Sequence, residues 1–126
     1  MIKKLLSFIS LILISFISYS GEQEYKYEII AENLSHPWGI ALIDEDDILF
    51  TELSGQLRII EKGVLNPKPI NGVPEVLFAG QGGLSGIILD PNFNSNNKIY
   101  IAFSSPDDGR KTNTLEVISA TLSSGS

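Results

Sequence analysis

The sequence predicts an all-β protein assembled from the repeating sheets, or blades, of a β-propeller. Short apolar runs alternate with turns that contain glycine, proline or asparagine, and no stretch has the spacing of an amphipathic helix. The apolar run at residues 38–43 begins again 46 residues later, at 84–89. A period of about 40–50 residues is that of a four-stranded propeller blade. The order of strand, turn, strand, turn and strand within the interval favours the same interpretation.

The individual strands are predicted from local patterns. Residues 38–43 are continuously apolar, which is typical of a strand buried on both faces. Residues 66–74 contain three prolines, which lack amide donors, so this stretch is expected to connect two blades. Residues 90–93, Asp-Pro-Asn-Phe, place proline at its favoured second position in a turn. The expected strands are 25–30, 38–43, 47–51, 56–60, 84–89, 98–103 and 115–122.

Residues 1–20 differ in character from the rest of the chain. A positively charged start, Lys3-Lys4, precedes an apolar run at 5–17, and small serines end it. This order is typical of a cleavable signal peptide. The alternative is an uncleaved membrane anchor, but a span needs about 20 apolar residues and this run is shorter. We therefore expect a signal peptide at 1–20, a propeller portion at 21–126, and an exported protein, periplasmic or extracellular, without a stable membrane anchor after cleavage.

Composition narrows the classes of partner. The chain has 9 basic and 15 acidic residues and a net charge of −6. A protein that binds nucleic acid through its phosphates needs a basic face, so nucleic acid is not an expected partner. Cysteine is absent, which excludes disulfides and thiolate metal sites and leaves stability to the packed core. Neutral or cationic small molecules remain plausible ligands for this acidic surface.

The length is short for a propeller. Without a 20-residue signal, 106 residues remain, which is about two and a half blades at the observed period. A propeller closes with at least about four blades, and an open set exposes sheet edges and apolar faces to water. We therefore expect incomplete blades here, and a natural protein that continues further or a truncated product.

Several known binding and catalytic motifs are partly matched, but each lacks a required residue. Residues 80–83, Gly-Gln-Gly-Gly, lack the last glycine of a dinucleotide-binding loop and precede a strand pattern rather than a helix. Residues 83–87 end in isoleucine where a nucleophile elbow has glycine. The single histidine excludes a zinc-protease pair. The acidic run at 44–47 lacks the ligand spacing and turn glycine of a calcium loop, so a solvated turn is the favoured interpretation.

The only histidine and the only tryptophan lie together in His36-Pro37-Trp38. Because histidine titrates near neutral pH, His36 could act as a catalytic base. The favoured alternative is structural: His36 satisfies backbone groups where a strand begins, Pro37 fixes the chain direction, and Trp38 joins the core.

Gln81 is the most informative polar residue. An amide side chain both donates and accepts hydrogen bonds, so it could hold a sugar hydroxyl or a quinone oxygen. The flanking glycines allow a sharp turn and the close approach of a ligand. The residue also precedes the first strand of a predicted blade, where propeller loops face the central channel. The residue types alone leave two interpretations equally open, a ligand contact and a tight turn with an exposed glutamine.

Seven short segments along the chain carry a further signal. They are Leu34-Ser35-His36-Pro37-Trp38-Gly39, Leu49-Phe50-Thr51-Glu52, Gly55-Gln56-Leu57-Arg58, Gly72-Val73-Pro74-Glu75-Val76, Gly80-Gln81-Gly82-Gly83-Leu84, Leu89-Asp90-Pro91-Asn92-Phe93 and Ile99-Tyr100. Taken in order, they resemble the soluble quinoprotein glucose/aldose sugar dehydrogenase family, whose members depend on pyrroloquinoline quinone (PQQ). Each segment is weak evidence alone, but the ordered set is specific and extends over roughly residues 28–122.

The resemblance implies a six-bladed β-propeller, of which this chain is the N-terminal part, incomplete, with the first blade and most of the second. It implies that residues 25–33 form the strand that completes the last blade. It also implies oxidation of aldose sugars to lactones with PQQ and calcium, and an electron acceptor as partner. Gln81 falls on the family's glutamine at the active-site wall, which makes it the predicted contact for both substrate and cofactor.

The departures from the family pattern are as informative as the matches. The family's catalytic histidine lies in a later glycine-rich motif that has no match here, and the calcium ligands and the basic residues that hold the quinone come from later blades. Leu53 replaces a frequent arginine, and Ser85-Gly86 replaces a commoner Leu-Asp pair. The chain alone is therefore expected to be inactive and is assigned no metal ligand. Two alternatives are a non-catalytic propeller that binds a partner and a degenerate, truncated reading frame.

Overall fold

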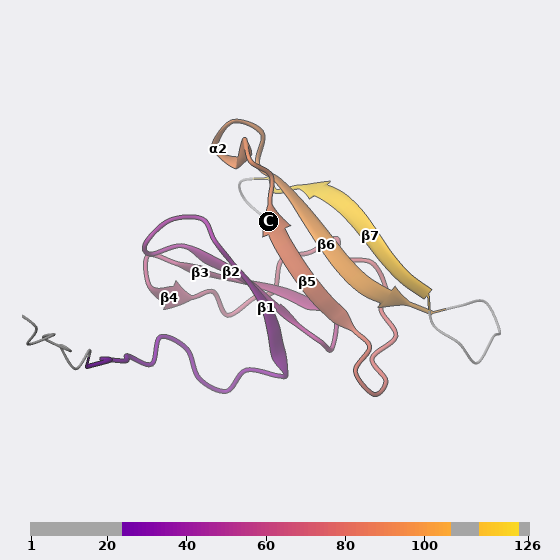
Figure 1. Ribbon diagram of the computed structural model, residues 1–126, viewed down its shortest axis with the longest axis horizontal. Coiled ribbons are helices and arrows are strands. Elements are labelled where there is room, and N and C mark those ends of the chain that lie inside the picture. Colours follow the sequence, from indigo (N-terminus) through magenta and orange to yellow (C-terminus); the bar gives the residue numbers. More distant parts are fainter. Residues whose placement is uncertain (1–23, 107–113, 124–126) are drawn as a thin grey trace, which may run out of the picture.

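The computed structural model describes residues 24–106 and 114–123, which form two antiparallel sheets (Figure 1). Sheet 1 has the order β1-β2-β3-β4 and sheet 2 the order β5-β6-β7, so each is a meander of neighbouring strands. The elements are β1 (Pro37–Leu42), β2 (Ile48–Glu52), β3 (Gln56–Glu61), β4 (Val64–Leu65), β5 (Leu84–Leu89), α2 (Phe93–Asn96), β6 (Lys98–Ser105) and β7 (Thr114–Thr121). The predicted all-β class is confirmed.

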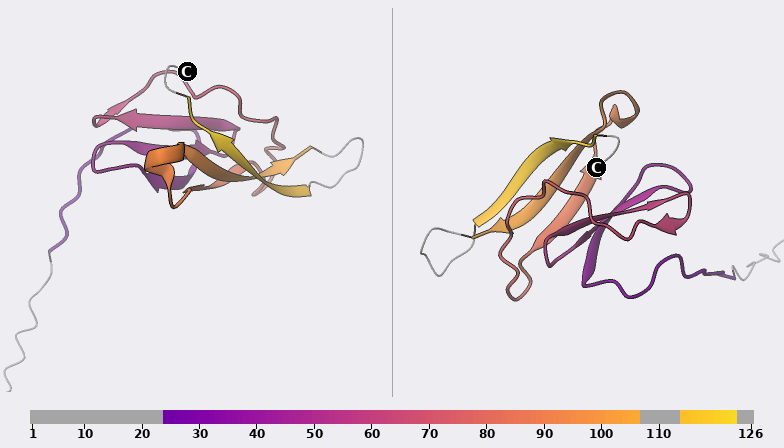
Figure 2. Two further views of the ribbon diagram at one scale, coloured as in Figure 1. Left: turned by 90° about the horizontal axis from the view of Figure 1, so that it is seen from above. Right: turned by 180° about the vertical axis from the view of Figure 1, so that it is seen from behind.

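The main core lies between the two sheets. β5 of sheet 2 packs on β1 and β2 of sheet 1, and Figure 2 shows the two sheets from two further directions. Leu49, Leu84 and Ile99 are completely buried in this core. Full burial of one such aliphatic side chain stabilises the fold by about 1.5–3 kcal/mol. The other buried members of the core are Ala41, Leu57, Ile87, Ile101 and Phe103.

A second, smaller apolar cluster lies on the opposite side of sheet 1, which we call its outer face. Ile48, Phe50 and Ile60 are buried there, and Ala31 and Leu34 of the N-terminal segment pack on them. These side chains alternate along β2 with the core residue Leu49, as strand geometry requires. Sheet 1 is therefore apolar on both faces, while its inner face alone contacts sheet 2.

Both sheets begin with the same irregularity. In each sheet the first strand places three residues where the second strand advances by two, which is a β-bulge. The equivalent register pairs are Pro37↔Glu52 and Ile40↔Phe50 in sheet 1, and Leu84↔Phe103 and Ile87↔Ile101 in sheet 2. Matching the bulges aligns position 37 with position 84, a spacing of 47 residues, one more than the sequence pattern predicts.

Two strand predictions need correction, and two short elements were not predicted. Residues 25–30 form no strand, nor does the wider range 25–33 that the resemblance implies, and Tyr25 and Tyr27 are exposed. The run at 38–43 is not buried on both faces: Trp38 is 61% exposed and so is not a core residue. A continuous apolar run cannot show whether both of its faces are covered. The two-residue strand β4 and the short helix α2 were not predicted, since each is too short to have a periodicity.

No helix in residues 24–106 or 114–123 is long and apolar enough to cross a membrane. The predicted signal peptide at 1–20 lies outside the described residues.

Candidate functional site

Gln81 lies in a tight turn between the long connecting segment and β5. The Gly82 N–H donates to the Ala79 carbonyl oxygen at 2.9 Å and closes this four-residue turn. Gly80 has a φ of 60°, a left-handed conformation that glycine adopts without strain. Gln81 itself is exposed. The turn therefore presents an amide side chain to solvent from a defined backbone position.

Gly83 anchors the turn to both sheets. It has a φ of 143°, and a Cβ atom at this position would overlap the backbone of Leu53 in sheet 1. The Leu84 N–H donates to the Leu53 carbonyl oxygen at 3.2 Å, and the Ser104 N–H donates to the Gly83 carbonyl oxygen at 3.0 Å. Glycine is thus needed here for its conformation and for the close approach of two backbones.

His36 is hydrogen-bonded to Leu53, the same residue that holds the start of β5. The Leu53 N–H donates to the His36 carbonyl oxygen at 3.0 Å, so Leu53 joins the loop before β1 to the start of β5. The imidazole ring meets Phe78 edge-on, with ring centroids 5.2 Å apart and planes at 61°. These contacts support the structural interpretation of His36, whose ring packs beside the segment that leads into the Gln81 turn. Figure 1 shows β1 and β5 starting at the same end of the molecule.

A buried ion pair, which was not predicted from the sequence, supports the His36 loop. Glu52 is 1% exposed, and its Oε1 accepts a hydrogen bond from the Ser35 N–H at 2.6 Å. Its Oε2 lies 3.4 Å from Arg58 Nη1, and Arg58 Nη2 donates to the Asn66 carbonyl oxygen at 3.1 Å. One signal was available in the sequence: an acid and a base on the facing strands of a predicted hairpin.

A second polar cluster lies at the opposite end of sheet 2. A backbone hydrogen bond from Asn92, then side-chain hydrogen bonds from Asn96 and Tyr100, hold the pKa of Asp90 below its ordinary value. The bond to Asp90, 2.8 Å long, raises the pKa of Tyr100. These contacts close the connection between β5 and β6, at the far end of β5 from Gln81, and have a structural role (Figure 1).

The acidic run at 44–47 forms the turn between β1 and β2. Asp44 Oδ1 accepts hydrogen bonds from the N–H groups of Asp46 and Asp47, at 2.9 and 2.8 Å. Asp47 Oδ1 accepts another from the Lys62 N–H at 2.7 Å. The predicted solvated turn is confirmed, because these carboxylates cap backbone groups. Across residues 24–106 and 114–123, no three His, Cys, Asp or Glu side chains are grouped to hold a metal ion.

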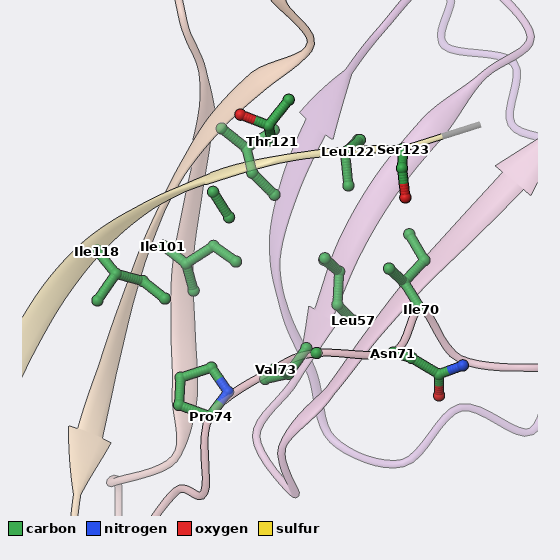
Figure 3. Close-up of a pocket in the computed structure, with 13 residues that line it drawn as sticks. Leu57, Ile70, Asn71, Val73, Pro74, Ile101, Ile118, Thr121, Leu122 and Ser123 are labelled. Atoms are coloured by element: carbon green, nitrogen blue, oxygen red, sulfur yellow. The ribbon is translucent and has the colours of Figure 1, made fainter. Parts of the chain in front are cut away.

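One hollow lies between the connecting segment and sheet 2 (Figure 3). Its volume is about 190 Å³, and apolar side chains including Leu57, Val73 and Ile101 surround it. Neither Gln81 nor His36 lines this hollow. Its residues continue the core between the sheets, so we assign it to packing rather than to ligand binding.

Two successive bulged sheets that pack on one another define the protein as part of a β-propeller, and comparison with known proteins identifies which kind. The Glucose / Sorbosone dehydrogenase family matches residues 34–126. The chain belongs to this family.

The similar proteins are sugar dehydrogenases or are uncharacterised. The aldose sugar dehydrogenase YliI of Escherichia coli is 32% identical over 84% of this chain and 29% of its own length. The uncharacterised protein slr1608 of Synechocystis is 42% identical over 68% of this chain and 23% of its own. The chain thus spans about a quarter of the length of these curated relatives.

Solved structures of such enzymes share the fold. The soluble aldose sugar dehydrogenase of Escherichia coli, in its apo form, superposes with a TM-score of 0.70 at 34% identity, over 77% of this chain and 28% of that one. The PQQ-bound aldose sugar dehydrogenase of Streptomyces coelicolor superposes with a TM-score of 0.68 at 23% identity, over 81% and 29%. The second likeness supports the fold alone.

The chemistry of the Gln81 amide suits one hydrogen-bonded contact to a quinone or a sugar. The exposed Gln81 amide can donate to and accept from such a ligand. The carboxylates of PQQ require cations, and Arg58 is already engaged by Glu52 and Asn66. Calcium requires several oxygen ligands, which the described residues do not group together. The described part of the chain therefore offers one exposed amide as a hydrogen-bonding group and no grouped ligands for calcium.

Proposed function

We propose that this chain supplies one wall of the active site of a PQQ- and calcium-dependent enzyme that oxidises aldose sugars to lactones. The observation that carries the proposal is the exposed Gln81, held on a turn that Gly83 fixes to the backbone of Leu53. Membership of the sugar dehydrogenase family and the likeness to the Escherichia coli aldose sugar dehydrogenase support it. The remaining walls and the catalytic base belong to blades that this chain does not contain.

The chemistry explains why a fixed amide is useful. Oxidation of an aldose at its anomeric carbon removes a hydride from that carbon and a proton from its hydroxyl group, and leaves a lactone. Bound PQQ would supply the acceptor for these two electrons, and a further electron acceptor would restore its oxidised form. Gln81 donates its amide N–H to an oxygen of the sugar or the quinone and accepts from a sugar hydroxyl, which orients the two reactants.

The proposal includes a location. Residues 1–20 act as an export signal, and residues 21–126 form the N-terminal part of a propeller in the periplasm or outside the cell. The apolar run between Lys3-Lys4 and the small serines supports this assignment. Export of the chain, with loss of these residues, is measurable by mass spectrometry of the secreted or periplasmic product.

A chimera tests the role of Gln81. Residues 34–122 replace the matching segment of the Escherichia coli aldose sugar dehydrogenase, and dye reduction is measured with PQQ, calcium and glucose. We expect Gln81→Ala to lower kcat/KM by about 10- to 100-fold, the effect of losing one hydrogen bond to a ligand. The matched control is Gln56→Ala, another exposed glutamine, at the start of β3. Equal activities of the two variants would remove Gln81 from the site. The 126-residue chain alone is expected to give no dye reduction.

A further inference from the structure

A fully buried threonine joins the two sheets close to the Gln81 turn. Thr51, on β2, is 0% exposed, and its hydroxyl group donates a hydrogen bond to the Ser85 carbonyl oxygen of β5 at 2.6 Å. Thr51 Oγ1 also accepts a hydrogen bond from the Gly39 N–H of β1 at 2.9 Å. A hydroxyl group can donate one hydrogen bond while it accepts another, so this one side chain connects three strands.

The sheet contact, rather than the bulge, requires this hydroxyl group. A Cβ atom on Gly39 would overlap the Ser85 carbonyl oxygen, so the glycine lets that oxygen reach Thr51. The equivalent positions of sheet 2 are Gly86 and Ala102, where a Cβ atom on the glycine would lie 3.4 Å from the alanine Cβ. Sheet 2 therefore forms the same bulge with no hydroxyl group at this position.

The bridge holds the end of β5 that leads out of the Gln81 turn. Ser85 lies four residues after Gln81. The residue before it, Leu84, donates its N–H to the Leu53 carbonyl oxygen at 3.2 Å. The Thr51 bond to Ser85, at 2.6 Å, is the shorter of the two bonds that join the start of β5 to the end of β2. Loss of the hydroxyl group would leave the longer bond alone to fix this point.

We propose that Thr51 is a positioning residue for Gln81, an inference that rests on the active-site role proposed for Gln81 above. The Thr51 hydroxyl group fixes the start of β5 against sheet 1 and so determines where the turn presents the amide. Thr51 is itself buried and acts through the backbone. A displacement of about 1 Å in a site can lower turnover by about 100-fold. Removal of one of two fixed points should cost less, about 5- to 10-fold.

Hydrogen exchange of single amides, followed by NMR in the full chain, tests the geometry without substrate or cofactor. Thr51→Val keeps the shape of the side chain and removes the hydroxyl group, whereas Thr51→Ser keeps the hydroxyl group. We expect Thr51→Val to speed exchange of the Gly39 and Leu84 N–H groups by about 10-fold, and Thr51→Ser by less than about 3-fold. The Asn97 N–H, bonded to Phe93 beyond the far end of β5, should be unchanged. Equal exchange in the two variants would overturn the proposal.

The matched control is a neighbouring hydroxyl group that bonds within one sheet. Ser85 Oγ donates to the Ala102 carbonyl oxygen at 3.0 Å, and both residues belong to sheet 2. Ser85→Ala removes this bond and leaves the carbonyl oxygen that Thr51 binds, so exchange at Gly39 should change by less than about twofold. If Thr51→Val does not fold, the unmutated chain still decides. A Gly39 N–H that exchanges as fast as an exposed amide would overturn the proposal.

Turnover in the chimera tests whether Thr51 acts through Gln81. Thr51→Val should lower kcat/KM by about 5- to 10-fold, and Thr51→Ser should restore it to within about twofold. In a chimera that already carries Gln81→Ala, Thr51→Val should lower kcat/KM by less than about twofold further, because the group that it positions is gone. A role in folding alone would lower activity equally in both backgrounds.

The outcomes separate this role from the proposed function. If Gln81→Ala leaves activity unchanged while the exchange rates respond as expected, the proposed function fails and Thr51 only joins the sheets. If Gln81→Ala lowers activity and Thr51→Val does not, the positioning role fails and the proposed function stands. An equal loss in Thr51→Ser and Thr51→Val, or an undiminished loss in the Gln81→Ala background, would also overturn the positioning role.

Discussion

Sheet 1 and sheet 2 share a strand order and a bulge, yet they differ at two positions that the bulge makes equivalent. Sheet 1 has Glu52 and Arg58 where sheet 2 has Phe103 and Ile118. In sheet 2 these positions face sheet 1 and are filled by apolar side chains. In sheet 1 they lie on the outer face, where the Ser35 backbone crosses and requires an acceptor. The same strand position is therefore polar or apolar according to what covers it.

The ion pair gives the largest expected effect. Glu52→Ala leaves the Arg58 guanidinium uncompensated and the Ser35 N–H without its acceptor, so we expect the free energy of unfolding to fall by about 3 kcal/mol. Urea unfolding monitored by circular dichroism measures the loss.

The apolar residues at the equivalent positions of sheet 2 provide the control for this prediction. The double variant Glu52→Phe with Arg58→Ile copies Phe103 and Ile118 into sheet 1 and removes both charges together. Removing both charges avoids an uncompensated guanidinium, but the Ser35 N–H still loses its acceptor, so we expect the double variant to recover part of the loss and to remain about 1 kcal/mol less stable than the natural chain. If the double variant were no more stable than Glu52→Ala, the segments that cover the two sheets would not explain why these positions are polar in sheet 1 and apolar in sheet 2.

The equivalent glycines give a smaller difference. Gly39→Ala forces the β1 and β5 backbones apart and should cost about 1–3 kcal/mol. Gly86→Ala meets only a side chain at 3.4 Å and should change stability by less than about 0.5 kcal/mol. Urea unfolding at the lowest workable protein concentration compares the two. Equal losses would show that Gly86, like Gly39, lies against a neighbouring backbone.

The smallest expected effect concerns the connection between β5 and β6 in sheet 2. Its counterpart in sheet 1 is the acidic turn at 44–47. The pKa of Tyr100 is raised above 10.0, so its bond to Asp90 stabilises the fold below that pH and is lost as pH rises through the higher folded value. The pKa of Asp90 is lowered below 3.8, so stability is present above that pH and is lost as pH falls through the lower folded value.

Tyr100→Phe should remove the alkaline loss and reduce the acid loss, because the hydroxyl group acts on both sides of the bond. The measurement is Tm as a function of pH. Tyr27→Phe, at an exposed tyrosine, is the matched control and should leave the profile unchanged. An alkaline loss that persists in Tyr100→Phe would assign it to another group.

Sequence reasoning predicted most of the fold but only part of the candidate site. Six of the seven expected strands are present, because β-branched runs between turn residues depend on local preference. Gln81 could be singled out as a candidate site residue because the glycines that flank it are visible in the sequence. Its link to His36 through Leu53 was not, because it depends on hydrogen bonds between backbones distant in the chain.

The sequence by itself determined the class of fold, the positions of the strands and the family, since each depends on residue types in a fixed order. Only the tertiary structure decided which faces are covered. Trp38 and Ile40 lie in an apolar run that reads as buried, yet no described sheet packs on their side of β1. The physical reason is that burial is a property of what lies opposite a side chain. Glu52 shows the converse, since a carboxylate is buried where a backbone N–H and an arginine meet it.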